Sequence, residues 1–380
     1  MFGMRLAFFR YLLGNLLLVA GIVAVFAGGW LLWAVAALAL VTGAPVDEAI
    51  GDDHAQFTDA QRLFFNANVY ATLPLLAALT VALLYRVAIT FHTGLAFGLA
   101  GLPSLAVAPD TAVLANVAVA VILTGYAYAL YGATVAHELV HRTDEPVAQW
   151  SARALLAFTF NTAFTIFHVH GHHRQVGTPN DPATAKRGEY ILSFVVRTAI
   201  GQFKDALKFE AARLQRRGGT PYGLGNRVVG GQLYSIALIV IAAIAAGWPG
   251  VATFVIAGLI GRVLHELVNY VQHYGLVRVE GAPIEQRHSW DSHRFLSNAL
   301  QYNLPRHADH HMFASKPFWQ LREAHDAPVL PHGYQTMVFV ALVPPLWRKT
   351  MGPLLADWDA RLASDAERAL VRQRGWEGRC

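Results

Sequence analysis

Long apolar segments run through this 380-residue sequence and limit the folds that it can adopt. Inside a bilayer, only helices and closed barrels satisfy every backbone hydrogen-bonding group, and a spanning helix needs about 20 apolar residues. Hydrophobic residues make up 54% of the chain and charged residues 14%, whereas ordinary soluble domains carry about 25% charged residues. Length and composition therefore predict an all-α integral membrane protein.

We expect about six transmembrane helices in one membrane-bound domain, residues 1–380. Residues 6–43 are nearly twice as long as one span, and Gly28-Gly29 interrupts them. This favours a hairpin of two short spans, although one long tilted helix is the alternative. The sequence GWPG separates the last two spans in the same way. The expected spans are residues 6–25, 27–43, 66–86, 111–136, 231–247 and 250–270.

The distribution of Lys and Arg predicts the orientation, because cytoplasmic segments carry an excess of both. Residues 137–230 and 271–380 are rich in them, whereas the two apolar turns are not. We therefore expect these two segments to form a helical cap on the cytoplasmic face, in a bacterial inner membrane. The net charge of +5 comes from residues between apolar segments rather than from one basic patch, so lipid is the expected environment and nucleic acid is not an expected partner.

Nine of the 17 histidines lie near the cytoplasmic end of a predicted span or in one of the two predicted cytoplasmic segments. In HELVHR and in LPRHADHH the spacing places the histidines on one helical face, and in FHVHGHHRQ they stand at i, i+4 and i+5. Four or five imidazole nitrogens complete one metal ion, so nine suggest two ions. The nine are His137, His141, His168, His172, His173, His273, His307, His310 and His311.

The residues alone leave the metal open, because all-imidazole sites suit iron, zinc, copper or nickel. HELVH is also the H-E-x-x-H motif of zinc proteases, and it contains the E-x-x-H unit of ferritin-like di-iron bundles. Both alternatives leave most of the other histidines without a role. A single cysteine, Cys380, excludes a cysteine-ligated zinc site or an iron–sulfur cluster held by this chain alone.

The histidine motifs resemble those of the membrane fatty-acid desaturase and hydroxylase superfamily. The runs NYVQHYGL, HHRQVGTPNDPATAKRGE and HSWDSHRFLSNALQYNLPRHADHH are similar to those of integral-membrane alkane hydroxylases. The segment YILSFVVRTAIGQFKDALKFEAARLQRRG and the tail LLADWDARL also resemble the hydroxylase subunit of xylene-type monooxygenases. Pro305 and Ala308 depart from the usual alkane-hydroxylase pattern, as does the extra His170.

The resemblance implies a non-haem di-iron monooxygenase that uses O₂ and two electrons to hydroxylate a terminal methyl group, with the nine histidines as ligands of two iron ions. Medium-chain alkanes are the expected substrates. Methyl groups on aromatic rings, of the xylene or cymene type, are the alternative. An acyl-lipid desaturase and a membrane zinc protease are more distant alternatives.

Carboxylates or amides beside the ligands are expected to orient the imidazole rings. The candidates are Glu138, Asp181, Asn269 and Asp309, each of which has an ordinary capping or surface role as the alternative. Polar residues late in the sixth span are costly in lipid, so they are either functional or reach the interface. These residues are Arg262, His265 and Glu266.

Electrons are expected from a separate protein, because the chain has neither a cysteine cluster nor a Gly-rich nucleotide fingerprint after a strand. The resemblance implies a rubredoxin or a ferredoxin-type donor with its reductase. Arg213, Arg216 and Arg217 are candidates to attract an acidic donor. The alternative is that these arginines only set the topology.

Overall fold

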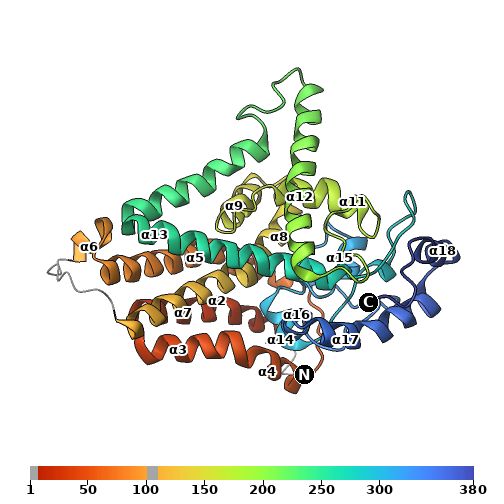
Figure 1. Ribbon diagram of the computed structural model, residues 1–380, viewed down its shortest axis with the longest axis horizontal. Helices are drawn as coiled ribbons and strands as arrows, with labels where there is room; N and C mark the ends of the chain where they lie inside the picture. Colours follow the sequence, from red (N-terminus) through yellow and green to blue (C-terminus); the bar gives the residue numbers. More distant parts are fainter. Residues whose placement is uncertain (1–6, 101–109) are drawn as a thin grey trace.

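The computed structural model describes residues 7–100 and 110–380 (Figure 1). Within these residues the chain is helical, and extended pairing is confined to two isolated bridges, Asp52 with Arg294 and Asp291 with Val329. The all-α membrane fold expected from the sequence is confirmed. Five helical segments of the described chain are long and apolar enough to cross a membrane: Ala7–Ala27, Gly29–Ile50, Asp59–Phe91, Thr111–Val140 and Arg227–His273.

The first two segments form a hairpin. Gly28 and Gly29 adopt φ values of +69° and +57°, which glycine reaches without the steric cost that other residues pay. Figure 1 shows α2 and α3 side by side after this reversal, as the hairpin interpretation predicts. The elements here are η1 (Ala7–Tyr11), α2 (Leu12–Ala27), α3 (Gly29–Ala37), η2 (Leu38–Thr42) and α4 (Gly43–Ile50).

The last segment, α13 (Arg227–His273), consists of two helical arms that meet at a sharp kink (Figure 1). Ala246 and Gly247 have non-helical backbone angles, and Pro249 follows them inside the helix. A proline removes one backbone donor and crowds the preceding turn, so it helps to break the helix here. The two arms of α13 correspond to residues 231–247 and 250–270, which the sequence predicts as two separate spans.

The remaining long helices are α5 (Arg62–Phe91) and the continuous run of α7 (Thr111–Ala127), η4 (Tyr128–Ala133) and α8 (Thr134–Val140). Both are longer than the expected spans. The expected apolar turn before residue 111 contains α6 (Gly94–Ala100), and its residues 101–109 lie outside the described residues. Figure 1 shows α6 at the end of the bundle opposite to α14 and α16–α18.

Shorter helices gather around the histidine-rich end, and α12 crosses the long helices and packs against α13 (Figure 1). These elements are α9 (Pro146–Ala157), α10 (Phe164–Phe167), η5 (His168–His172), α11 (His173–Gln175), α12 (Ile191–Gln215), α14 (Phe295–Leu300), α15 (His307–Met312), α16 (Tyr334–Ala341), α17 (Pro344–Asp357) and α18 (Asp365–Gln373), with single turns η3 (Asp59–Gln61), η6 (Gln286–His288), η7 (Phe318–Gln320) and η8 (Trp358–Leu362).

Two buried acidic residues, one within α4 and one just after it, hold the third histidine motif in place. Asp53 is buried and lies 2.5 Å from Arg10 and 3.1 Å from Arg306, the residue before His307. Asp47 is also buried, and its carboxylate accepts the backbone N–H of Leu296 at 2.7 Å. Buried charges are stable when they are paired and hydrogen-bonded, so these contacts fix residues 294–306 against the N-terminal hairpin.

Candidate metal centre

The structure brings the nine predicted histidines together as two adjacent groups. In each group, every histidine contributes one ring nitrogen, and these nitrogens all lie within 4.8 Å of one another. The two groups meet where the rings of His173 and His311 stack with centroids 4.4 Å apart. The five-histidine group contains His137, His141, His168, His173 and His310; the four-histidine group contains His172, His273, His307 and His311.

The second motif is divided between the groups by a π-helical turn. Element η5 (His168–His172) is a π-helix, in which hydrogen bonds run from i to i+5. In an α-helix, residues five apart point about 140° away from each other. The wider turn instead brings His168 and His173 onto one side, with their Nε2 atoms 3.0 Å apart. His172 therefore points to the other group, which the i, i+4, i+5 spacing does not predict by itself.

The third motif is also divided, although its spacing suggests a single shared face. His307 and His311, four residues apart on α15, have Nε2 atoms 3.1 Å apart and belong to the four-histidine group. His310 turns towards His173, at 3.1 Å between Nε2 atoms, in the five-histidine group. His137 and His141 of the first motif stay together, as their i, i+4 spacing predicts.

The distances between nitrogens fit metal ligation better than hydrogen bonding. The Nε2 atom of His173 lies at 3.0 Å and 3.1 Å from two other Nε2 atoms, and the Nε2 of His307 has two such neighbours at 3.1 Å. One imidazole nitrogen carries at most one proton, so it cannot bond well to both neighbours. Ligands about 2.1 Å from an ion are about 3.0 Å apart at right angles but about 3.4 Å apart at the tetrahedral angle. The observed separations of 3.0–3.1 Å are thus those of nitrogens that share one metal ion.

The same rings are available as neutral ligands. Burial, reinforced by the neighbouring imidazoles, lowers the pKa of His168, His173, His307, His310 and His311 well below the usual value. Burial lowers the pKa of His141 to about 3. The Nε2 atoms of His141 and His172 are buried without a hydrogen-bond partner among the described residues. Neutral imidazole with a free nitrogen is the form that binds a metal ion.

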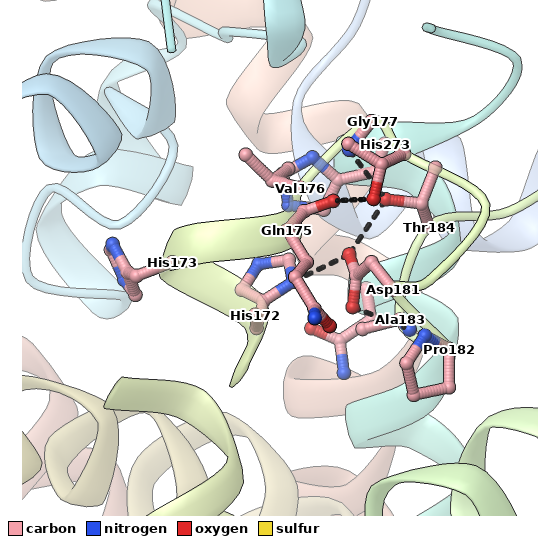
Figure 2. A network of polar contacts seen from close by, with 12 residues as sticks. His172, His173, Gln175, Val176, Gly177, Asp181, Pro182, Ala183, Thr184 and His273 are labelled. Carbon is pink, nitrogen blue, oxygen red and sulfur yellow. Dashed lines mark hydrogen bonds and ion pairs between the residues drawn. The ribbon is translucent and has the colours of Figure 1, made fainter. Parts of the chain in front are cut away.

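Asp181 orients one of the rings. Its Oδ2 atom accepts a hydrogen bond from His172 Nδ1 at 2.9 Å and another from Thr184 Oγ1 at 2.7 Å, and Oδ1 accepts the Ala183 N–H at 3.0 Å. Figure 2 shows His172 turned towards Asp181, with His173 pointing to the opposite side. A carboxylate on Nδ1 leaves Nε2 free to face the four-histidine group, which is the arrangement expected around a metal-binding histidine.

The other three orienting candidates bind different partners. Glu138 receives hydrogen bonds from Arg142 at 2.8 Å and from the Phe318 N–H at 3.1 Å, which engages both of its oxygens. The carboxylate of Asp309 accepts hydrogen bonds from Lys316 Nζ and from the Arg322 N–H, and the side-chain amide of Asn269 donates a hydrogen bond to Glu266. Both oxygens of Glu138 are thus used to hold Arg142 and the Phe318 N–H, and neither accepts a hydrogen bond from an imidazole in the described part of the chain.

Asp291 is a supporting residue that sequence reasoning missed. It is fully buried, and its Oδ1 atom accepts the Ala308 N–H at 2.7 Å, within the first turn of α15. Burial raises the pKa of this carboxyl to about 8. Because α15 carries three of the nine histidines, this contact fixes the position of the third motif. The only sequence signal is that Asp291 lies in the conspicuous run HSWDSHRFL, which does not reveal the partner.

The polar residues of the sixth span contact other polar side chains of the protein, and His265 and Glu266 are buried. Arg262 pairs with Glu266 at 2.8 Å, and Glu266 also accepts a hydrogen bond from Gln202 of α12 at 2.8 Å. His265 contacts Asn161 at 3.3 Å. His170, the extra histidine of the second motif, is only partly buried and belongs to neither group.

An apolar cavity of about 630 Å³ reaches the five-histidine group. His137 lies at its inner part, with Ala133 one turn before it on the same helical run. Val41, Ile122 and Phe339 also line the cavity, and these apolar side chains are 67%, 43% and 45% exposed. The cavity therefore leads from an exposed apolar surface, formed by two candidate membrane-spanning segments and α16, to a candidate metal ligand.

Fold and site together define an all-helical membrane protein with a buried, histidine-rich metal centre. The chain belongs to the fatty acid desaturase family, whose sequence profile matches residues 112–341. The match includes all nine histidines of the two groups.

Similar curated proteins are monooxygenases by name. Alkane 1-monooxygenase 1 of Pseudomonas aeruginosa is 38% identical over 227 residues, which cover 58% of this chain and 59% of that protein. Alkane 1-monooxygenase of Acinetobacter baylyi is 36% identical over 221 residues, 57% of this chain and 54% of the relative. The xylene/toluene monooxygenase hydroxylase component XylM of Pseudomonas putida is 34% identical over 250 residues, 64% and 66% of the two chains. The matched segment thus spans less than two thirds of each relative.

Proposed function

We propose that this protein is a membrane-bound di-iron monooxygenase that hydroxylates the terminal methyl group of medium-chain alkanes. The observation that carries the proposal is that the apolar cavity reaches the five-histidine group at His137, beside the second histidine group. In this proposal each group holds one iron ion through its imidazole nitrogens. The chemistry that such a centre supplies when bound is activation of O₂ with two electrons, so that one oxygen atom enters a C–H bond.

The protein's own residues would select and orient the substrate. The cavity volume of about 630 Å³ lies within the usual range for small-molecule sites, and its wall is mainly apolar. An unbranched chain that enters between Val41, Ile122 and Phe339 can lie along the cavity with its methyl group towards His137. Holding one C–H bond near the reacting centre lowers the entropic part of the barrier, and an apolar wall keeps water away.

The electron donor in this proposal is a separate rubredoxin or ferredoxin-type protein with its reductase, acting at a cytoplasmic face of a bacterial inner membrane. Of the three arginines considered for steering it, Arg213 pairs with Glu210 at 2.8 Å, which leaves less of its charge free. Arg216 and Arg217 are exposed at the end of α12.

Hydroxylation of methyl groups on aromatic rings is the second candidate. The relative from Pseudomonas putida that is named as a xylene/toluene monooxygenase component matches 64% of this chain, a larger share than the two alkane 1-monooxygenases described above. A cavity of this volume also accommodates a substituted ring.

One assay separates these functions. The purified chain, with a rubredoxin or ferredoxin donor and its reductase, is given octane, p-xylene or cymene under O₂, and the products are separated by gas chromatography. 1-Octanol as the dominant product supports the proposal, and faster turnover of the alkylbenzenes supports the second candidate. With an acyl lipid as a further substrate in the same assay, formation of an internal double bond in the acyl chain would indicate a desaturase. Bound metal, measured on the same sample, should be iron, whereas zinc alone would favour the protease.

A further inference from the structure

A second, polar pocket reaches the five-histidine group at a different histidine from the apolar cavity. Its volume is about 270 Å³, and its wall includes His141 and Glu138 of the first histidine motif. Asp59, Glu145 and Ser315 at its rim are exposed or partly exposed, whereas Glu138 and Arg142 deeper in the pocket have side chains only 11% and 12% exposed. The pocket therefore leads from the surface inwards to a candidate metal ligand.

The two cavities touch different histidines of one group. His137 lines the apolar cavity and His141 lines the polar pocket, and these residues are four apart on one helical run. None of the four histidines of the other group lines either cavity, and all four are buried. The five-histidine group is thus the place where an apolar path and a polar path meet.

The lining of the polar pocket suits water and small ions. Asp59, Glu138 and Glu145 are balanced by Arg62, Arg142 and Lys316, so no single sign of charge predominates. Docking of a charged protein would instead favour a surface of one sign. A polar space of about 270 Å³ is large enough for several water molecules.

We propose that this pocket is the aqueous portal of the five-histidine group, through which metal ions reach the site and through which protons enter and water leaves. The second part rests on the proposed hydroxylation, whose balance requires it. One oxygen atom of O₂ enters the C–H bond, and the other leaves as water after taking two electrons from the donor and two protons. An apolar cavity filled by substrate offers these protons and this water no path, whereas the pocket at His141 does.

Metal uptake provides the first test, because it does not depend on the reaction. Replacing the single cysteine, in Cys380→Ser, allows a new thiol to be placed at the rim as Ser315→Cys. The apoprotein is labelled there with a bulky, charged methanethiosulfonate reagent, and uptake of Co²⁺ is followed by its visible absorption. Labelled protein should bind Co²⁺ several-fold more slowly than the same variant before labelling. The matched control is labelled Ser193→Cys on α12, which is exposed and lines neither cavity.

Equal uptake rates before and after complete labelling of Ser315→Cys, verified by mass, would overturn the metal-entry part. A second variant, Gln320→Trp, narrows the same mouth without a label and should slow uptake in the same direction. For the reaction, protein loaded with iron before labelling should lose turnover without losing iron. If its turnover is unchanged, the proton and water part is wrong. If unlabelled wild type forms no alcohol at all, the proposed function fails, while the Co²⁺ result still decides whether the pocket is the metal portal.

Discussion

Asp181→Asn should weaken metal binding at the four-histidine group while leaving the fold intact. In the wild type, Oδ2 accepts from both His172 Nδ1 and Thr184 Oγ1, and Oδ1 accepts from the Ala183 N–H. An asparagine has one oxygen and one NH₂ group. Its NH₂ group must therefore face either the donors of His172 and Thr184 or the Ala183 N–H, and it cannot accept a hydrogen bond from them. Loss of such a carboxylate partner typically costs 10–100-fold in metal affinity, which corresponds to about 1.4–2.7 kcal/mol.

The assay is metal retention. Purified variants are dialysed against increasing concentrations of a chelator, and bound iron is measured by mass spectrometry. Asp181→Asn should lose iron at roughly 10–100-fold lower chelator concentration than the wild type. Asp309→Asn is the matched control, because Asp309 lies beside His310 but holds Lys316 and the Arg322 N–H rather than an imidazole. Equal retention by Asp181→Asn and the wild type would refute the orienting role. Equal loss by both variants would show only a general charge effect.

Four further outcomes test other parts of the molecule. His137→Ala should abolish both hydroxylation and full iron occupancy, whereas His170→Ala, outside both groups, should keep both, as measured by product and metal analysis. Ala133→Phe should shift the product profile towards shorter alkanes, because it fills the cavity next to His137. NADH alone should give no product until a carrier and its reductase are added, which an NADH-dependent product assay checks. Gly94→Ala should lower the free energy of unfolding by at least about 1 kcal/mol, as measured by denaturant unfolding. Gly94 has φ +76°, and a Cβ there would lie 2.5 Å from the carbonyl oxygen of Ala245.

The membrane fold follows from the sequence because a bilayer leaves few choices for an apolar chain. Gly28-Gly29 and GWPG correctly mark the reversal and the bend, since positive φ at Gly28, Gly29 and Gly247 is a local property. Local sequence patterns do not give the residues at which the helices end. Hydropathy ends the fourth span at residue 136, but the helix continues to Val140 and so carries His137 in the same rigid run.

The candidate ligands are recognisable in the sequence, because nine clustered histidines are costly to bury unless they bind metal, but their partition is not. A sequence shows i, i+4 and i+5, whereas the π-turn at η5 decides which side each ring faces. That turn depends on tertiary packing, which places Phe209 and Phe167 within 3.1 Å of the Cβ position that Gly171 lacks. The role of Asp291 cannot be predicted from the sequence for a related reason. Its partner is a backbone N–H 17 residues away, and no pattern of side chains indicates that contact.

The partition means that the two histidine groups cannot be positioned independently. His172 and His173 are neighbours in the chain but belong to different groups, and His310 and His311 repeat this arrangement on α15. Any shift of η5 or α15 therefore moves ligands of both groups at once. The buried contacts around these elements, from Asp181 to His172 and from Asp291 to the Ala308 N–H, restrain such shifts on both sides. A close-packed interior transmits small displacements instead of absorbing them, so a structure that holds one group in its binding geometry also holds the other.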